Sequence, residues 1–238
     1  EAAVDILRKK GQKVAAKRAD RDATEGAVIA KTNGADKGAV IKLSCETDFV
    51  AKNEDFVALA NKIADIALTS GVATAEELGA VEFEGGLTVA AKLQEQTGVI
   101  GEKIEVAEMA TVSAPYVASY IHMGNKIGTL VGLTAEAAEA GRDVAMQAAA
   151  MNPVALNRDA VPQEVIDREL EVGKDLARQE GKPEAMLDKI AAGRLNKFFK
   201  ENTLVDQDFI KDSKLSVSKY LTSVEAGLAV VDFKRVSL

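Results

Sequence analysis

Hydrophobic residues along the chain follow two periods, one typical of strands and one typical of amphipathic helices. β-Branched runs at residues 26–32 and 38–43 flank Asn33-Gly34, a pair that tolerates the positive φ angles of a tight turn, so a β-hairpin is predicted. Residues 53–69 carry apolar side chains at three- and four-residue spacing, which predicts a helix with one buried face made of Phe56, Leu59, Ala60, Ile63, Ile66 and Ala67. Gly71 is expected to end this helix.

The second half of the chain repeats this order of elements. After short helices at 74–78 and 87–96, the pattern predicts three strands and a helix: strands at 104–112, 116–121 and 127–133, and an Ala-rich helix at 137–151. Gly38 to Ile41 with its helix then corresponds to Gly128 to Val131 with the Ala-rich helix. The fold class expected is α+β, with two related subdomains of small antiparallel sheets covered by helices.

Residues 162–199 have a different pattern, typical of an antiparallel helical hairpin, or coiled coil. Pro162 suits a first helical turn, and Gly181 and Pro183 separate two amphipathic segments. The apolar faces are too thin to form a core of their own, so the hairpin either folds back on the sheet or projects as an arm. A helix at 217–221 and a strand at 228–236 follow, and this strand is placed to rejoin the second sheet.

The composition is that of a globular protein with an acidic surface. The 238 residues carry a net charge of −7, which argues against a general nucleic-acid binder. A single cysteine excludes an internal disulfide and is consistent with a reducing compartment. Apolar runs are interrupted by charges before they could span a bilayer, so no membrane contact is expected. No secretory signal is visible, although the chain starts with Glu1 rather than Met.

The junction between the predicted hairpin and the helix at 53–69 holds Thr47, Asp48, Phe49 and Val50. Thr47 or Asp48 could cap a helix, but turns rarely contain an aromatic residue. Local packing explains most apolar residues beside a helix start, so the residues alone favour Phe49 as a staple on the first helical turns. The alternative is that Phe49 belongs to a binding site.

A catalytic site would have to use Cys45 and His122, each the only residue of its type. Such a pair could act as nucleophile and base. Cys45, however, ends an apolar strand, where a small buried hydrophobe is the commoner role. The sequence contains no phosphate-binding glycine loop of the GxxxxGK type and no His/Cys cluster with metal-ligand spacing. Neither an enzyme nor a metal site is expected.

The motif Thr47-Asp48-Phe49-Val50-Ala51-Lys52, with Cys45 two residues upstream, resembles the signature of the elongation factor Ts family. A second match is Ser119-Tyr120-Ile121-His122-Met123-Gly124, which resembles a partner-facing turn of that family. The resemblance runs along the whole chain and includes Gly193-Arg194-Leu195. Residues 1–21 are a basic segment, with seven Lys or Arg against three acids, that would be a solvated helix or connector. It resembles the end of the family's amino-terminal helical domain and its linker.

The resemblance implies a non-enzymatic guanine-nucleotide exchange factor for elongation factor Tu that needs no cofactor. It implies that residues 47–50 disturb the Mg²⁺ site of Tu, with Phe49 as a wedge, and that His122, Met123 and Gly124 bind Tu. Homodimers and Tu–Ts heterotetramers are both compatible with it, as is a cytoplasmic location or an organellar matrix. The runner-up is a module that self-associates through the helical hairpin, with Phe49 merely packed.

The domains expected are a remnant of the amino-terminal domain and linker at 1–21, a first subdomain at 22–112 and a second at 113–238. The hairpin at 162–199 is expected as an insertion into the second subdomain.

Overall fold

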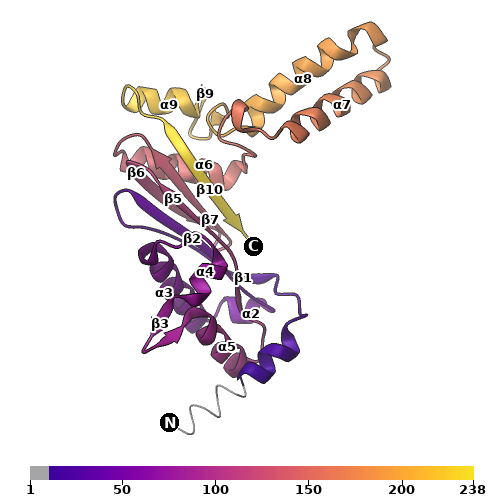
Figure 1. The fold of residues 1–238 in the computed structure, drawn as a ribbon. Helices are drawn as coiled ribbons and strands as arrows, with labels where there is room; N and C mark the ends of the chain where they lie inside the picture. The colour runs from indigo at the N-terminus through magenta and orange to yellow at the C-terminus, as the bar shows by residue number, and fades with distance from the viewer. Residues whose placement is uncertain (1–10) are drawn as a thin grey trace.

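The computed structural model describes residues 11–238, and two three-stranded antiparallel sheets form the centre of the molecule (Figure 1). The strand order is β1-β2-β5 in the first sheet and β10-β7-β6 in the second. Their bounds are Glu25–Thr32 (β1), Lys37–Cys45 (β2), Glu105–Ser113 (β5), Tyr116–His122 (β6), Ile127–Leu133 (β7) and Val230–Ser237 (β10). The α+β class, the first hairpin and the return of the last strand to the second sheet are therefore confirmed.

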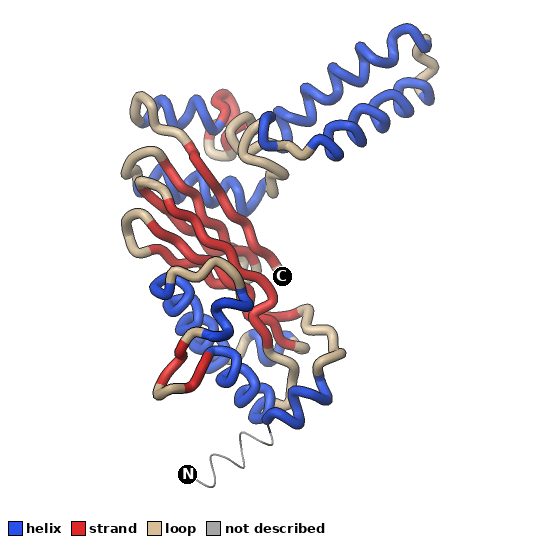
Figure 2. The backbone as a smooth tube through the Cα atoms, in the orientation of Figure 1, coloured by secondary structure: helices blue, strands red, loops and turns tan. Residues whose placement is uncertain are grey.

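One long helix covers the outer face of each sheet (Figure 2). α3, Glu54–Ser70, lies on the first sheet and α6, Ala138–Met151, on the second. The Asn53 side chain accepts hydrogen bonds from two amides of the first turn of α3, and Gly71 ends the helix at φ 74°. The apolar stripe predicted for α3 packs on β1 and β2 in one continuous core, with Phe56, Ala60, Ile63 and Ala67 almost fully buried.

The inner faces of the two sheets pack on each other. Their interface is made of small and β-branched side chains from both sheets: Val28, Ala30, Val40, Val112, Val117, Leu130 and Val236. A Cβ on Gly38 of β2 would lie 2.8 Å from atoms of Leu130 and Val117, and a Cβ on Gly128 of β7 would lie 2.8 Å from Val28. The glycines that the sequence repeat pairs therefore let the central strands approach closely. The subdomain boundaries at residues 22–112 and 113–238 stay predictions.

Between α3 and β5 the chain forms a small hairpin that the sequence did not predict. After α4, Ala75–Ala80, the strands β3, Glu82–Glu84, and β4, Leu87–Thr88, pair across a two-glycine turn. The helix expected at 87–96 begins later, as α5, Val89–Ile100, with Thr88 as its cap. The positive φ angles of Gly85 and Gly86 close the turn, and this draws Leu87 into strand pairing instead of a helical turn.

The helical hairpin consists of α7, Gln163–Gln179, and α8, Leu187–Asn202, joined by a short turn and the 3₁₀ helix η2, Glu184–Met186. It projects away from the sheets as an arm, so the alternative in which it folds back on them is wrong (Figure 1). Its two helices bury small residues against each other, above all Gly173, Ala177 and Ala191. Only the base of the arm shares a cluster with the body, through Phe199, Val161 and Ala155.

The remaining elements connect the arm to the second sheet. The 3₁₀ helix η1, Arg158–Ala160, precedes the arm. After it come β8, Asp208–Phe209, β9, Asp212–Ser216, and α9, Val217–Val224. At the other end, residues 11–18 are helical, whereas residues 1–10 of the helix predicted for 1–21 lie outside the described residues. Within residues 11–238, no helix combines the length and the apolar character needed to cross a membrane.

Deleting residues 162–199 and joining the ends with a short Gly-Ser linker is expected to leave the two sheets folded, because α7 and α8 pack on each other and the arm shares a hydrophobic cluster with the body at its base. Circular dichroism should show the loss of the α7 and α8 signal with a single cooperative thermal transition retained. The modest loss of stability should come from Phe199 at the base of the arm. Global unfolding of the variant would show that the arm belongs to the core.

Candidate functional site

The junction after β2 forms a separate one-turn helix, α2, Asp48–Ala51. Thr47 has extended backbone angles, and its Oγ1 accepts a hydrogen bond from the Val50 N–H at 3.5 Å. The amides of Ala51 and Lys52 donate to the carbonyls of Thr47 and Asp48, both at 3.1 Å. Thr47 is therefore a helix cap, as its residue type allowed, but the helix that it caps is α2. The longer helix α3 begins separately, with Asn53 as its cap.

Phe49 points away from the protein, with 84% of its surface exposed. Val50 and Ala51, the next two residues, pack against the core beneath the first sheet. Successive helical residues are about 100° apart around the axis, so a helix whose Val50 faces inward turns Phe49 toward solvent. The staple interpretation of Phe49 is therefore wrong, because an exposed ring does not brace the start of α3.

Asp48 is half-exposed and precedes Phe49 in the chain. Lys52 Nζ is 2.7 Å from Asp48 Oδ2, and this hydrogen bond, together with the lysine charge, lowers the pKa of the carboxyl. Asp48 therefore carries a full negative charge at neutral pH. A ring and a carboxylate are thus displayed together on one turn of helix.

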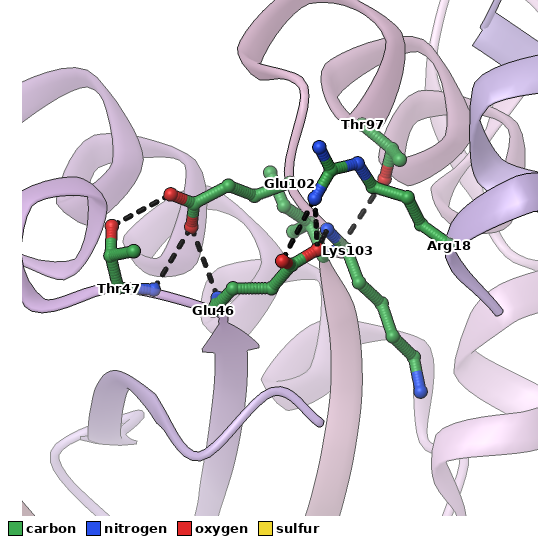
Figure 3. Close-up of polar contacts among 7 residues, drawn as sticks. Arg18, Glu46, Thr47, Thr97, Glu102 and Lys103 are labelled. Atoms are coloured by element: carbon green, nitrogen blue, oxygen red, sulfur yellow. Dashed lines mark hydrogen bonds and ion pairs between the residues drawn. The ribbon is translucent and has the colours of Figure 1, made fainter. Parts of the chain in front are cut away.

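Two glutamates fix the backbone in front of α2 (Figure 3). Glu102 accepts hydrogen bonds from the amides of Glu46 and Thr47, both at 3.0 Å, and from the Thr47 hydroxyl at 2.7 Å. Glu46 in turn accepts from the Lys103 amide at 2.7 Å and from the Arg18 guanidinium at 2.8 Å. We call these contacts among Arg18, Glu46, Thr47, Glu102 and Lys103 the polar lock. The sequence analysis did not predict it. The one local feature that could have indicated it is an acid placed directly after Gly101, the residue that ends α5.

The second predicted segment lies in the turn between β6 and β7. Met123, Gly124 and Asn125 have φ angles of 55°, 62° and 67°, so three successive residues occupy the left-handed region. Met123 is 64% exposed. The His122 ring lies against Tyr120, with its Nδ1 3.2 Å from the tyrosine hydroxyl oxygen. The turn therefore presents an apolar side chain beside an imidazole.

β1 connects the two segments. Its first residue, Glu25, pairs with Cys45 just before α2, and the amide of Val28 donates to the Asn125 carbonyl at 2.7 Å. Val28 is three residue steps along the strand from Glu25, which is about 10 Å at roughly 3.3 Å per residue. The structure thus brings the 47–50 and 122–124 segments to the same end of the two sheets (Figure 1).

The cysteine and histidine that a catalytic hypothesis requires have other partners. Cys45 is completely buried, and its thiol donates to the Thr47 carbonyl at 3.3 Å. Burial, reinforced by the charge of Glu102, raises the pKa of the thiol to about 12. The hydrogen bond of His122 is with Tyr120. Among residues 11–238 there is also no group of three or more His, Cys, Asp or Glu side chains placed to hold a metal ion.

We expect the Cys45 thiol to resist a disulfide reagent such as Ellman's in the folded protein at pH 8. The thiolate is the reactive species, and with a pKa of about 12 it amounts to roughly one part in ten thousand at that pH. In denaturant the pKa returns to about 9.0 and the thiol should react promptly. One equivalent titrated only after unfolding is the expected result, and rapid labelling of the folded chain would contradict it.

These features define an α+β protein with a two-sheet core and an aromatic residue displayed on a one-turn helix at one end of it. The family model described as elongation factor TS matches residues 46–238, and the chain belongs to the elongation factor Ts family, whose members act in protein biosynthesis. It is 57% identical to elongation factor Ts of Christiangramia forsetii and 53% identical to that of Flavobacterium psychrophilum. Each comparison covers the whole chain and 87% of the relative.

Similarity extends to elongation factor Ts of Kineococcus radiotolerans, at 43% identity over 99% of the chain and 86% of the relative. The family expected from the motifs at residues 47–52 and 119–124 is therefore confirmed. The roles assigned to individual side chains in those motifs are a separate matter and stay predictions.

Proposed function

We propose that this chain is a guanine-nucleotide exchange factor for elongation factor Tu and acts by binding, without catalytic residues, metal or cofactor of its own. Membership of the elongation factor Ts family supports the partner. The observation that carries the proposal is Phe49, an aromatic side chain that is 84% exposed on a one-turn helix fixed by the polar lock. An exposed aromatic on a rigid base suits a buried anchor in a complex.

In this proposal Phe49 enters between helices of Tu while Asp48 and its neighbours disturb the Mg²⁺ environment. Mg²⁺ demands nearly ideal octahedral geometry and retains several waters, so a small displacement of its surroundings weakens both the ion and the phosphate contacts. The chain then binds nucleotide-free Tu more tightly than Tu with GDP. Linkage requires that GDP weaken the complex by the same factor.

The turn at His122, Met123 and Gly124 supplies a second contact on Tu. It lies at the same end of the sheets as α2, so one rigid face can engage the partner at two points. Two anchored points restrict the approach of Phe49 more than one could. The complex forms in the cytoplasm, between two proteins and without nucleic acid or membrane.

The test is release of a fluorescent GDP from a bacterial elongation factor Tu in stopped flow. Release should accelerate with the concentration of this chain and reach a plateau. Added Mg²⁺ should slow the accelerated release, because the proposal requires displacement of that ion. Release that is unchanged at saturating concentrations of the chain would overturn the proposal.

A second candidate function, self-association through the helical arm, is favoured by one observation. Val172 and Leu176 of α7 and Met186 near the tip each expose more than two fifths of their surface. Sedimentation with and without residues 162–199 measures this property by itself. A module that only self-associates would form the dimer yet leave GDP on Tu.

A further inference from the structure

α2 is too short to be held by its own hydrogen bonds, and Val50 and Ala51 pack against the core while only partly buried. It has four residues, whereas an isolated helix is marginal in water below about 12 residues, because nucleation is costly. None of its residues is fully buried, and its capping hydrogen bond from Val50 N to Thr47 Oγ1 is long, at 3.5 Å. An exposed ring on such a helix would be displayed in many directions unless another group fixes the turn.

The Glu102 carboxylate, 55 positions after Thr47 in the sequence, is the group that fixes this turn. Its Oε1 accepts from the Thr47 hydroxyl, and its Oε2 accepts from the amides of Glu46 and Thr47. Hydrogen bonds to a carboxylate are about twice as strong as neutral ones. A hydroxyl can donate once and accept as well, so the proton given to Glu102 leaves the Thr47 oxygen free to accept from Val50. Glu102 thus orients the cap of α2.

The loop that carries Glu102 is held in the same way, by a carboxylate from the chain before α2. The Glu46 carboxylate accepts from the Lys103 amide, the residue next to Glu102, and from Arg18 in the helical segment 11–18. The amide of Lys103, and then the charge and hydrogen bond of Arg18, lower the pKa of Glu46. Each loop therefore uses its carboxylate to bind the backbone of the other, and neither loop can shift alone (Figure 3).

We propose that Glu102 is a positioning residue of the exchange site, which holds α2 through Thr47 so that Phe49 is presented in one orientation. Glu102 acts through the helix and makes no contact with the partner. This inference rests on the proposed exchange function for its effect on GDP release, but the ordering of α2 by Glu102 is a property of the chain alone. The two parts can therefore be tested separately.

The first test is amide hydrogen exchange on the free protein. Glu102→Ala should speed exchange of the Ala51 and Lys52 amides at least about ten-fold, the size expected for a lost hydrogen bond to a charged group. The amide of Val57 in α3 should keep its rate. Equal rates in both proteins, or α2 amides that exchange as fast as unprotected ones in the unsubstituted chain, would overturn the proposal.

The second test is a double-mutant cycle on GDP release. Glu102→Ala should slow release about ten-fold in the unsubstituted chain and less than about two-fold when Phe49→Ala is already present, because residues that act through one another are not additive. Glu102→Gln, which keeps one acceptor oxygen, should lie between. The matched control is Glu105→Ala, which removes a neighbouring, half-exposed carboxylate paired with Lys103 and should leave release unchanged.

The outcomes separate the inference from the function on which it rests. If Glu102→Ala slows release by the same factor in both backgrounds, it acts elsewhere and the inference fails while the exchange function stands. If the unsubstituted chain releases no GDP, the exchange function fails, and hydrogen exchange still decides whether Glu102 orders α2. Should Glu102→Ala fail to fold, the same cycle and exchange measurements with Glu102→Gln decide the matter.

Discussion

Phe49→Ala is expected to remove most of the stimulated GDP release while leaving the melting temperature unchanged. Aromatic anchors at the centre of an interface typically cost about 2–4 kcal/mol when truncated, which corresponds to roughly thirty-fold or more in affinity. The ring is 84% exposed in the free protein, so its removal opens no cavity. Stopped-flow release and a thermal scan on the same preparations measure both quantities.

The matched control is Phe56→Ala, seven positions along the chain. Phe56 is 1% exposed in the core between α3 and the first sheet, and truncation of a buried phenylalanine costs about 3–5 kcal/mol. That variant should melt far lower, but any folded fraction should still exchange. The same chemical change thus gives opposite results at two sites. A melting temperature that falls as much for Phe49→Ala would mean that the ring supports the fold.

The contrast between these two phenylalanines also shows where sequence reasoning reached its limit. Phe56 belongs to a stripe of apolar residues at helical spacing, so its burial was predictable from local pattern alone. Phe49 has no such stripe, since α2 is a single turn whose direction is set by Val50 on one side and Glu102 on the other. The family motif identified Phe49 as a candidate, but the residues alone favoured the staple.

The polar lock could not be predicted from the sequence either, but for a different reason. Glu46 and Glu102 come together only because β2 and β5 are neighbours in the first sheet, and no periodicity encodes which loops a sheet brings together. The projection of the helical arm also could not be predicted from local sequence pattern. Small residues such as Gly173 and Ala191 allow its two helices to pack closely on each other. Their pattern does not show, however, that the pair of helices projects away from the sheets.

The other large effect on stability is expected from Gly128→Ala, because Gly128 lies where the two sheets approach each other closely. The added methyl would lie 2.8 Å from Val28 Cγ1 and 3.0 Å from Val40 Cγ2, so these side chains, or the strands β1 and β2 that carry them, must shift away from β7. Overpacking of this kind costs about 1–3 kcal/mol. Gly193→Ala is the control, because its methyl meets nothing within 4 Å and replaces glycine inside α8, a change worth about 0.5–1 kcal/mol in favour of the folded state.

The same substitution should also affect exchange, because Gly128 lies in β7 directly after the His122 turn, and this turn is held against β1 by the Val28 amide. A shift of the second sheet moves the turn relative to α2, which should weaken the two-point contact that we propose. Adding Val28→Ala removes the methyl that Gly128→Ala would strike, so the double variant should lose less stability than the two single losses combined. Chemical denaturation measures this coupling. If the losses instead add fully, the close approach at Gly128 does not set the spacing of the sheets, and the 47–50 and 122–124 segments owe their common orientation to β1 alone.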